Sequence, residues 1–484
     1  MVAMTRLNSI VLVVLVCVAA CDPVKVTGEN PDAGGGPGDD GGTPPDAPLP
    51  DSGGGPCTSN AQCSAPLGVC APDGVCVACV ASTDCTASDT APVCDTDARA
   101  CRGCTADAEC AGGGVCVETQ GRCVAADGVA FVTMMGSDLG TCTRATPCLT
   151  IQYAISKLNG RHAIHVLGGS LTSQTATIAD VGMLAIDGED TTINASGTAS
   201  TFVIRGANDV TIEGFRLGVP VSSPSGAPDV PAVLVSGSTS HATIDDVIFG
   251  GSGGTAVSGL SGATVKLSHS HVGTLSTNNT FTVASNSATT TLSDNTFEMT
   301  IVEHSNGGSI TVERNRFEST RDGSVHASGG VLVMQNNLVI HRDGFNDSMY
   351  ATGLQPGSTI RFNTFANTTA TSSDGSAIYC DNSVQITSNV FAYNSGHPIT
   401  GQGCATRYST FDDVALTSAG TGNHVAGIDT IFVNRAGGNY HLSSGSVAKA
   451  HAEPGIDMVT DDFEGNPRPN PTGSNADCGA FEAP

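Results

Sequence analysis

Residues 310–319 read ITVERNRFES, and close echoes of this stretch occur before and after it. The echoes are TLSDNTFEMT at 291–300, LVMQNNLVIH at 332–341, TIRFNTFANT at 359–368 and QITSNVFAYN at 385–394. Each contains an aliphatic residue, two variable positions, Asn, one variable position and an apolar residue that is usually Phe. A phrase that returns at a nearly constant interval is typical of a repeat architecture, so this phrase decides the fold.

The phrase can be aligned along most of the chain, and successive copies lie 20 to 32 residues apart. Its first aliphatic residue falls at Ile164, Ile186, Ile212, Ile244, Leu267, Leu292, Val312, Val333, Ile360 and Ile386. Short β-prone runs separated by Gly, Asn, Asp and Ser favour a solenoid of strands. The Leu-x-x-Leu-x-Leu consensus of leucine-rich repeats is missing, and no 3.6-residue periodicity supports helical repeats. We therefore predict a parallel β-helix, whose strands pair with those of neighbouring coils about 4.8 Å away.

The repeated asparagines are predicted to hold the coils together and not to carry chemistry. They are aligned at Asn295, Asn315, Asn336, Asn363 and Asn389. Asn tolerates the left-handed conformation that a bend between strands requires. Amides stacked one above another can also form a hydrogen-bonded ladder that satisfies buried polar groups. The accompanying aromatic residues are expected to stack inside the coil, at Phe297, Phe317, Phe365 and Phe391.

The first residues predict export and a lipid anchor. Arg6 precedes an apolar run at 10–16, and Val18-Ala19-Ala20-Cys21 follows. Such a short apolar core ending in small residues is typical of an export signal and is too short to span a bilayer. The Cys after Val-Ala-Ala resembles the bacterial lipobox, which implies a signal peptide at 1–20 and diacylation of Cys21. The alternative is a plain secretory signal whose Cys21 joins a disulfide.

Composition bounds the partners of the exported chain. Residues 21–56 are rich in Gly, Pro and Asp and predict a disordered, lipid-anchored linker. The protein has 46 acidic and 20 basic residues and a formal net charge of −26. Phosphate backbones would repel such a surface, which argues against nucleic-acid binding. We expect attachment to the membrane through the lipid, on the bacterial cell envelope, at the outer membrane or the cell surface.

Residues 57–124 are predicted to form three disulfide modules of four cysteines each. The cysteines are Cys57, Cys63, Cys70 and Cys76; Cys79, Cys85, Cys94 and Cys101; and Cys104, Cys110, Cys116 and Cys123. With few large apolar residues, such a segment needs covalent links, and export makes them available. Two C-x2-C pairs, Cys76/Cys79 and Cys101/Cys104, leave zinc open as the alternative. The connectivity of the cysteines is not deducible from their spacing.

Residues 127–484 resemble the right-handed parallel β-helix, or pectin-lyase-like, superfamily. The whole chain is similar to bacterial surface lipoproteins that join Cys-rich modules to such a helix. The resemblance rests on the repeated phrase, on Gly140–Cys148 followed by an amphipathic stretch at 151–155, and on closing segments at 429–432, 439–442, 462–465 and 478–482. It implies an all-β fold: a disordered linker, a small disulfide-rich modular region, then a right-handed parallel β-helix with a cap at each end.

Seven further cysteines lie outside the three modules. Within the region of the resemblance, Cys142 and Cys148 are expected to pair. Cys380 and Cys404 lie 24 residues apart, about one coil, so a disulfide could bridge adjacent turns. Cys478 is then unpaired, unless this pairing is wrong.

Enzymes of this superfamily cut or epimerise acidic polysaccharides, so an active site was sought. The Asn-Thr-Asp, Asp-Asp, Gly-His-Gly and Arg-Ile-Lys hallmarks of its glycosidases are not present as a set; Asp412-Asp413 stands alone. No signature of the acidic ligands and arginine base of its calcium-dependent lyases is apparent. The chain has no Trp and six Tyr, which argues mildly against a deep sugar cleft. We expect no metal site and no cofactor.

One group of residues is a candidate site. Arg321-Asp322-Gly323 and Arg342-Asp343-Gly344 each begin nine residues after an aligned coil start, and Asp374-Gly375 extends the column. Asp322, Asp343 and Asp374 are the catalytic candidates, because stacked carboxylates can titrate apart into an acid and a base. Arg321, Arg342, His326 and His341 are the ligand-binding candidates. The alternative is a solvated ladder of turns and salt bridges. The Pro-rich stretch 218–232 is a second candidate contact surface.

Two functions remain open at this point. In the first, a non-catalytic surface lipoprotein presents a rigid β-helix for adhesion, binding of an extracellular polysaccharide or surface protein, or envelope structure. In the second, the chain is a polysaccharide lyase, glycosidase or epimerase that acts on acidic glycans. The missing motif set favours the first.

Overall fold

The computed structural model describes residues 56–483, with internal gaps. The gaps are 86–89, 173, 196–198, 221–229, 275–279, 320–322, 342–347, 368–375, 382–383, 393–397, 413–419 and 457–458. The predicted signal peptide, Cys21 and nearly all of the predicted linker therefore lie outside the described residues. Within the described residues, no helix is both long and apolar enough to pass through a bilayer.

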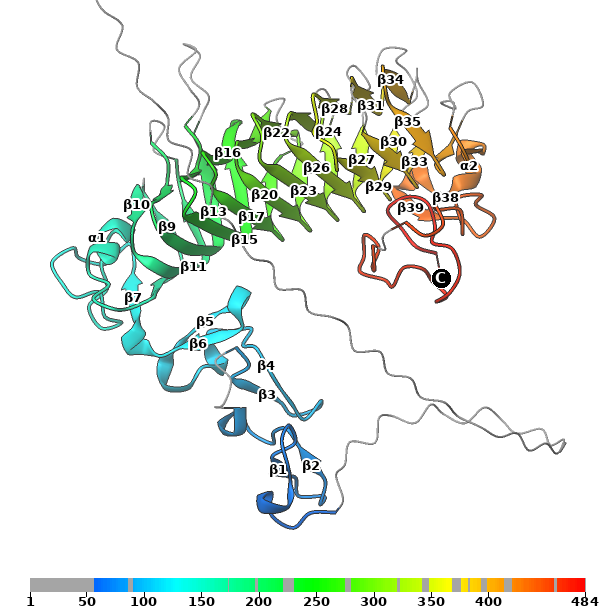
Figure 1. The fold of residues 1–484 in the computed structure, drawn as a ribbon. Coiled ribbons are helices and arrows are strands. Elements are labelled where there is room, and N and C mark those ends of the chain that lie inside the picture. The colour runs from blue at the N-terminus through cyan, green and yellow to red at the C-terminus, as the bar shows by residue number, and fades with distance from the viewer. Residues whose placement is uncertain are drawn as a thin grey trace, which may run out of the picture. The chain divides into compact units, whose positions relative to one another are not determined.

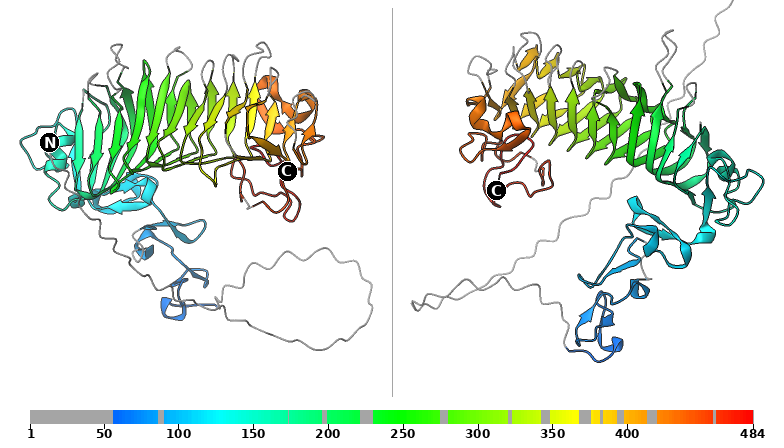
Figure 2. Two further views of the ribbon diagram at one scale, coloured as in Figure 1. Left: turned by 45° about the horizontal axis from the view of Figure 1, so that its top comes forward. Right: turned by 180° about the vertical axis from the view of Figure 1, so that it is seen from behind.

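The chain from residue 129 onward winds into a parallel β-helix, as the repeated phrase predicts (Figures 1 and 2). One face is a ten-stranded parallel sheet: β10 (Ala176–Ala179), β12 (Phe202–Arg205), β14 (Val233–Ser236), β16 (Gly254–Leu260), β19 (Phe281–Asn286), β22 (Thr300–Ser305), β25 (Val325–Ser328), β28 (Met349–Thr352), β31 (Ile378–Cys380) and β34 (Ile399–Gly401). We call it the ring-bearing sheet, for the aromatic side chains described below.

A second row of parallel strands carries the repeated phrase: β7 (Val129–Val132), β8 (Ala163–Val166), β11 (Gly182–Ile193), β13 (Asn208–Val219), β15 (Ser240–Gly251), β17 (Thr264–Ser268), β20 (Thr289–Ser293), β23 (Ser309–Glu313), β26 (Val331–Gln335), β29 (Thr359–Arg361), β32 (Gln385–Thr387) and β35 (Ala405–Arg407). We call it the phrase sheet. A third row lies beside it, formed by the second halves of the long strands β11, β13 and β15 and by separate strands in the other coils: β9 (Ser170–Leu171), β18 (His271–Gly273), β21 (Thr296–Glu298), β24 (Arg316–Ser319), β27 (Leu338–His341), β30 (Thr364–Asn367), β33 (Val390–Ala392), β36 (Thr410–Phe411) and β37 (His424–Val425).

The aliphatic residues of the phrase form one buried column, with a correction at one coil. Val312 pairs with Met334, and Met334 pairs with Ile360, so Met334 and not Val333 occupies the coil start. The other nine predicted starts are in register with one another. Val333 and Met334 are both apolar, so the pattern alone does not distinguish them, but a one-residue shift sends a side chain to the opposite face of a strand.

The same shift moves one member of the asparagine ladder from Asn336 to Asn337. Each ladder amide donates to the next across four contacts of 2.9–3.1 Å: Asn295 to Asn315, Asn315 to Asn337, Asn337 to Asn363, and Asn363 to Asn389. The predicted ladder is thereby confirmed, but the predicted left-handed conformation of its members is wrong. That conformation belongs to the residue before each one: Asp294, Arg314, Asn336, Phe362 and Ser388. Turning the chain at the preceding residue aims the ladder amide inward.

The phenylalanines of the phrase stack inside the coils, as predicted. Phe297 lies 4.9 Å from Phe317 between ring centroids, and Phe365 lies 5.3 Å from Phe391. Val339 occupies the position between the two stacks, and Phe411 extends the second at 5.0 Å. Full burial of these rings favours the folded coil by about 2 kcal/mol each.

The two ends of the β-helix are closed by the predicted segments. At the first end, α1 (Ile151–Ser156) follows a loop closed by the Cys142–Cys148 disulfide, as expected. At the other, α2 (Ile428–Ile431) leads into β38 (Phe432–Asn434), which pairs with β39 (Asn439–Leu442). The C-terminal segment then packs back on the outer side of β27 and β33, where Phe481 and Cys478 join a buried cluster.

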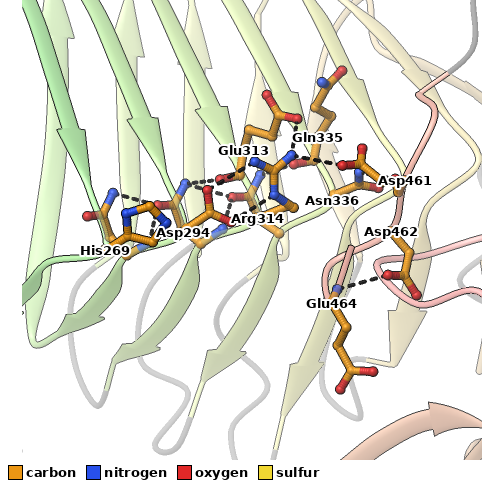
Figure 3. Close-up of polar contacts among 12 residues, drawn as sticks. His269, Asp294, Glu313, Arg314, Gln335, Asn336, Asp461, Asp462 and Glu464 are labelled. Atoms are coloured by element: carbon orange, nitrogen blue, oxygen red, sulfur yellow. Dashed lines mark hydrogen bonds and ion pairs between the residues drawn. The ribbon is translucent and has the colours of Figure 1, made fainter. Parts of the chain in front are cut away.

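Charged and polar contacts also fix the C-terminal segment to the turns of the coils (Figure 3). Arg314 donates to Asp294 at 2.7 Å and to Glu313 at 2.6 Å, and lies 3.5 Å from Asp461. The side-chain amide of Asn336 donates to the backbone carbonyl of Asp461 at 2.7 Å. Asn336 thus joins the coil to the C-terminal segment and takes no part in the ladder.

The three Cys-rich modules share one connectivity, first to third and second to fourth cysteine. The disulfides are Cys57–Cys70, Cys63–Cys76, Cys79–Cys94, Cys85–Cys101, Cys104–Cys116 and Cys110–Cys123. All twelve cysteines are engaged in disulfides, which contradicts the zinc alternative. Each module contains one hairpin: β1 (Val69–Cys70) with β2 (Cys76–Val77), β3 (Val93–Asp95) with β4 (Ala100–Arg102), and β5 (Val115–Val117) with β6 (Arg122–Val124).

The remaining cysteines of the described region also follow the expectation. Cys380 and Cys404 form a disulfide between adjacent turns. Cys478 is the free cysteine of the described residues and is buried. Short 3-10 helices complete the fold at Asn60–Gln62, Ser82–Cys85, Asp107–Glu109, Ala111–Gly113, Glu118–Gln120, Ala126–Gly128 and Arg435–Gly437.

Candidate functional site

Most of the predicted site residues cannot be placed. Arg321, Asp322, Arg342, Asp343 and Asp374 lie outside the described residues, so the column of Asp-Gly turns stays a prediction. The central part of the stretch 218–232, residues 221–229, lies outside them as well.

The two predicted histidines are described, and the structure puts them on different sheets. His341 ends β27 and is completely buried in the coil. His326 lies on the outer face of β25 in the ring-bearing sheet and is partly exposed. The two imidazoles therefore do not form one site.

A column of carboxylates that the sequence analysis did not single out lies on the outside of the phrase sheet. Asp187, Glu213 and Asp245 each follow the coil-start aliphatic residue and pair directly in β11, β13 and β15. Since alternate residues of a strand face opposite sides, the buried starts send these carboxylates outward. Neighbouring members lie one coil apart, about 4.8 Å, a distance at which like charges repel.

The turns after this column add further acidic groups. In β11 the pairing register shifts between Asp187 and Thr191, and the extra residues include Glu189 and Asp190 in the left-handed conformation. Asp246 takes the same conformation after Asp245. At the matching place in the coil between them stands Gly214, where an added Cβ would lie 3.3 Å from an Asp187 oxygen. Glycine thus leaves room for the Asp187 carboxylate.

These groups line a pocket of about 210 Å³, which we call the acidic pocket. Its carboxylates are Glu118, Asp187, Glu189, Asp190, Glu213, Asp245 and Asp246. Glu118 comes from the third disulfide module and the other six from the β-helix. Neither Lys nor Arg is among the described residues that line it. The cavity is negative, although three of its carboxylates contact basic side chains outside it: Asp190 lies 3.5 Å from Arg216, Asp187 2.5 Å from His165 and Asp245 2.9 Å from His269.

Glu213 is the most constrained of the seven. Glu213 is 5% exposed, and its Oε1 is buried without a hydrogen-bond partner. Oε2 accepts a 3.1 Å hydrogen bond from the backbone amide of Thr119. Burial raises the pKa of Glu213 to about 7, although the Thr119 hydrogen bond opposes this; the nearby charges of Asp187 and Glu118 raise it further. Such a carboxylate lacks a positive partner.

The third disulfide module covers Glu213, the middle member of the column. Besides the Thr119 contact, the side-chain amide of Gln120 donates to the Thr211 hydroxyl at 3.4 Å. Asp107 of the same module lies 3.6 Å from Nε2 of buried His165, whose Nδ1 lies 2.5 Å from Asp187. Burial lowers the pKa of His165, but the hydrogen bond to Asp187 and the surrounding carboxylates together raise it above its usual value. The His165 side chain therefore links the module to the β-helix.

An open groove of about 710 Å³ adjoins the acidic pocket and shares Glu118 and Asp245 with it. Lys266 lies in this groove on β17, one coil beyond Thr243 and in register with it. His269 is also in the groove, where its Nδ1 lies 2.9 Å from Asp245. Thr243 of β15 and Ser268 of β17 add hydroxyl groups to the lining of the groove. The groove thus offers an amine, an imidazole and hydroxyls beside a negative cavity.

The acidic pocket has the donor chemistry of a hard divalent cation site of the calcium type, although among the described residues the carboxylate-containing group whose ligand atoms lie within 4.8 Å of one another is Asp107, His165 and Asp187. Its donors are oxygens, supplied by carboxylates from three coils and the module, and calcium prefers six to eight oxygen ligands. Buried carboxylates are normally paired or bound to a metal, and Oε1 of Glu213 has neither kind of partner in the described residues. Asp187, Glu213, Asp245 and Glu118 are the residues that would hold the ion.

A sequence signal for this site existed but needed the correct register. Reading one residue past each aligned start gives His165, Asp187, Glu213 and Asp245, four ionisable residues in succession. Burial of Glu213 by the third module has no counterpart in the repeat, so only the structure shows it.

The strand register defines the class of the protein: its long region is a parallel β-helix. No protein-family model matches the chain, and no curated protein sequence matches it significantly. Among solved structures, pectate lyase Pel9A aligns with 14% identity and a TM-score of 0.45, over 74% of this chain and 96% of that one. XylC in complex with xylose aligns with 10% identity and a TM-score of 0.37, over 59% and 76%. These similarities concern the fold and do not assign an activity.

Proposed function

We propose that the protein is a lipid-anchored surface protein of the bacterial envelope that binds an acidic polysaccharide in a cation-dependent manner and is not an enzyme. The acidic pocket carries this proposal, above all the buried, unpartnered Oε1 of Glu213. The adjoining groove, with Lys266 and His269, supports a second, anionic ligand next to the ion.

In this proposal the pocket carboxylates bind the ion, and the groove residues bind the polymer. A divalent ion would neutralise the pocket and offer free coordination positions to a sugar carboxylate. Lys266 is placed to attract a second anionic group of the polymer, and Thr211 and Thr243 to exchange hydrogen bonds with its hydroxyls. Because Glu118 belongs to the module, the ion would also hold the module and the β-helix together.

The predicted anchor supports the surface placement. The export signal with Cys21 and the Gly-, Pro- and Asp-rich segment up to residue 56 would hold the binding region away from the membrane. Strongly acidic proteins repel acidic polymers, which makes a bridging cation necessary for this ligand class.

The test is calorimetric titration of the full-length protein, first with calcium and then with polygalacturonate or alginate. We expect calcium binding that is abolished by Glu213→Gln, and polysaccharide binding that requires calcium. Glu303→Gln, at an exposed position of the ring-bearing sheet, is the matched control and should bind as the wild type does. Wild-type protein that binds neither calcium nor an acidic polysaccharide would refute the proposal.

One observation favours a second candidate, a polysaccharide lyase. Lys266 lies in the groove beside the carboxylates, where an amine can act as the base that removes the proton next to an ion-bound sugar carboxylate. Incubation with the same polymers would then release unsaturated products that absorb ultraviolet light. Lys266→Ala should abolish product formation while leaving calcium binding intact.

A further inference from the structure

A column of aromatic side chains runs along the outer face of the ring-bearing sheet, on strands other than those of the acidic pocket. His326, Tyr350 and Tyr379 lie on β25, β28 and β31 and pair directly from coil to coil. Their neighbours along each strand are buried in the core, so the three rings face outward. Two of the six tyrosines of the chain are thus gathered on adjacent coils.

The three rings are in continuous contact. The centroids of His326 and Tyr350 are 4.7 Å apart in an edge-to-face arrangement, and those of Tyr350 and Tyr379 are 5.8 Å apart. Tyr379 is 36% exposed. Beside the column is a shallow concavity of about 270 Å³, lined by His326, Ala327, Ser328, Tyr350 and Thr352. An extended ligand would therefore meet ring surface over three coils.

Hydroxyl groups accompany the rings. Ser328 and Thr352 pair directly in the next outward row of the same sheet, and Thr400 continues the ring column on β34. A flat apolar ring next to a hydroxyl matches the two kinds of surface on a sugar, its C–H face and its hydroxyl edge. The coil repeat of about 4.8 Å offers this pair again at each step along the β-helix, which suits a polymer of repeating units.

The charge of the column selects between classes of polysaccharide. The residues that line the concavity carry no carboxylate and no amine, and the one carboxylate that continues the Ser328 and Thr352 row, Asp381, accepts a 2.9 Å hydrogen bond from the backbone amide of Gly353. Glu303 pairs with His326 and places a negative charge at one end. The column therefore offers no partner to an anionic sugar, and an uncharged one enters without the cost of burying a charge.

We propose that His326, Tyr350 and Tyr379 form a binding site for an uncharged polysaccharide, with its chain lying along the axis of the β-helix. The site is separate from the acidic pocket, because it lies on the other sheet and requires no cation. The protein would thus hold neutral polymer at one face independently of any acidic ligand at the other.

The experiment measures binding of the full-length protein to soluble β-glucan, glucomannan and xylan by affinity electrophoresis, with excess EDTA so that the acidic pocket has no ion. We expect at least one polymer to bind. Tyr350→Leu and Tyr379→Leu should each weaken that binding by about three- to tenfold, the amount that an aromatic contact contributes. Tyr350→Phe retains the ring and should stay within about twofold of the wild type.

The controls separate lost rings from lost folding. His326→Leu should weaken binding, whereas His241→Leu, at an exposed position on the phrase sheet, should not. Tyr350→Phe shows that the protein folds when only the hydroxyl is removed.

The proposal is overturned if no uncharged polymer binds the wild type, or if the leucine variants bind as the wild type does. Self-association that Tyr379→Leu abolishes, without polymer binding, would reassign the column to contact between copies. Loss of acidic-polymer binding in Glu213→Gln has no bearing on this result.

Discussion

The backbone amide of Thr119, in the third disulfide module, donates a 3.1 Å hydrogen bond to Oε2 of Glu213, on a coil of the β-helix 94 residues further along the chain. This contact makes the module part of the site, because it buries a carboxylate that would otherwise face water. The disulfide modules are therefore more than spacers: the third one contributes Glu118 and the cover of the acidic pocket.

Replacing Glu213 should have opposite effects with and without calcium. In EDTA, Glu213→Gln should raise the free energy of unfolding by about 1 kcal/mol or more, because it removes a buried charge among like charges. In calcium at a hundredfold excess over Kd, the wild type gains about 2.7 kcal/mol and the variant should not. Urea unfolding under the two conditions measures both values. The idea fails if calcium stabilises the two proteins equally.

Calcium should also hold the third module on the β-helix. The carboxylate of Glu118 comes from the module, so an ion shared with Glu213 opposes separation of the two parts. We expect calcium to slow proteolytic cleavage around residues 125–128, the connection between module and helix, and Glu118→Gln to reduce this protection. Mass spectrometry of the fragments identifies the cleaved bonds. Equal protection of Glu118→Gln and Glu303→Gln would contradict the shared ion.

The shifted ladder can be tested by a pair of neighbouring substitutions. Asn337→Ala removes hydrogen bonds to the Val312 and Gln335 carbonyls and breaks the ladder between Asn315 and Asn363. We expect a loss of about 3 kcal/mol or more, because buried groups are left unpaired. Denaturant titration gives the change in unfolding free energy.

Asn336→Gly is the matched control for that experiment. It loses the hydrogen bond to the Asp461 carbonyl, but glycine adopts the left-handed conformation of this position without strain. The expected loss is about 1 kcal/mol. A larger loss at 336 than at 337 would restore the register that the phrase alone predicts.

One buried histidine should make stability depend on pH. Burial lowers the pKa of His304, so the unfolded chain binds a proton more readily than the folded one below about pH 6.5. The corresponding stability is complete above that pH and is lost as the pH falls toward the lowered pKa. The raised pKa values of Glu213 and His165 act in the opposite direction in this range, so the prediction concerns a difference: the unfolding free energy of His304→Gln relative to the wild type should rise between pH 7.5 and 5.5, whereas that of the exposed control His241→Gln should not change. Parallel pH profiles in all three proteins would exclude His304 as the cause.

The fold could be predicted because its determinants are local and repeated. Each copy of the phrase brings its own inward aliphatic residue, and five successive copies add the ladder Asn, with Phe in four of them; stacking like groups on successive coils satisfies them together. Where two choices were equivalent in type, as with Val333 and Met334 or Asn336 and Asn337, local pattern could not decide between them. Packing decided, since Met334 is buried in the core and Asn337 is hydrogen-bonded to both neighbouring amides.

The candidate sites were less accessible to sequence reasoning. The acidic residues at Asp322 and Asp343 stood out because they recur in an Arg-Asp-Gly motif, whereas Asp187, Glu213 and Asp245 share no motif beyond their place after a coil start. Similarly, the scarcity of aromatic residues gave no hint that two tyrosines and a histidine lie on consecutive coils. Composition gives the number of aromatic residues but not their positions, whereas the coils of the solenoid bring residues that are distant in the sequence side by side.

By itself, the sequence determined that this chain stacks its coils around a ladder of amides and rings, and that its twelve module cysteines fall into three units of four. Only the tertiary structure decided which outward residues share a surface and which of them are buried. The physical reason is that inward positions are selected by a core that every coil shares, whereas the environment of an outward carboxylate depends on a segment elsewhere in the chain, here the third disulfide module lying over Glu213.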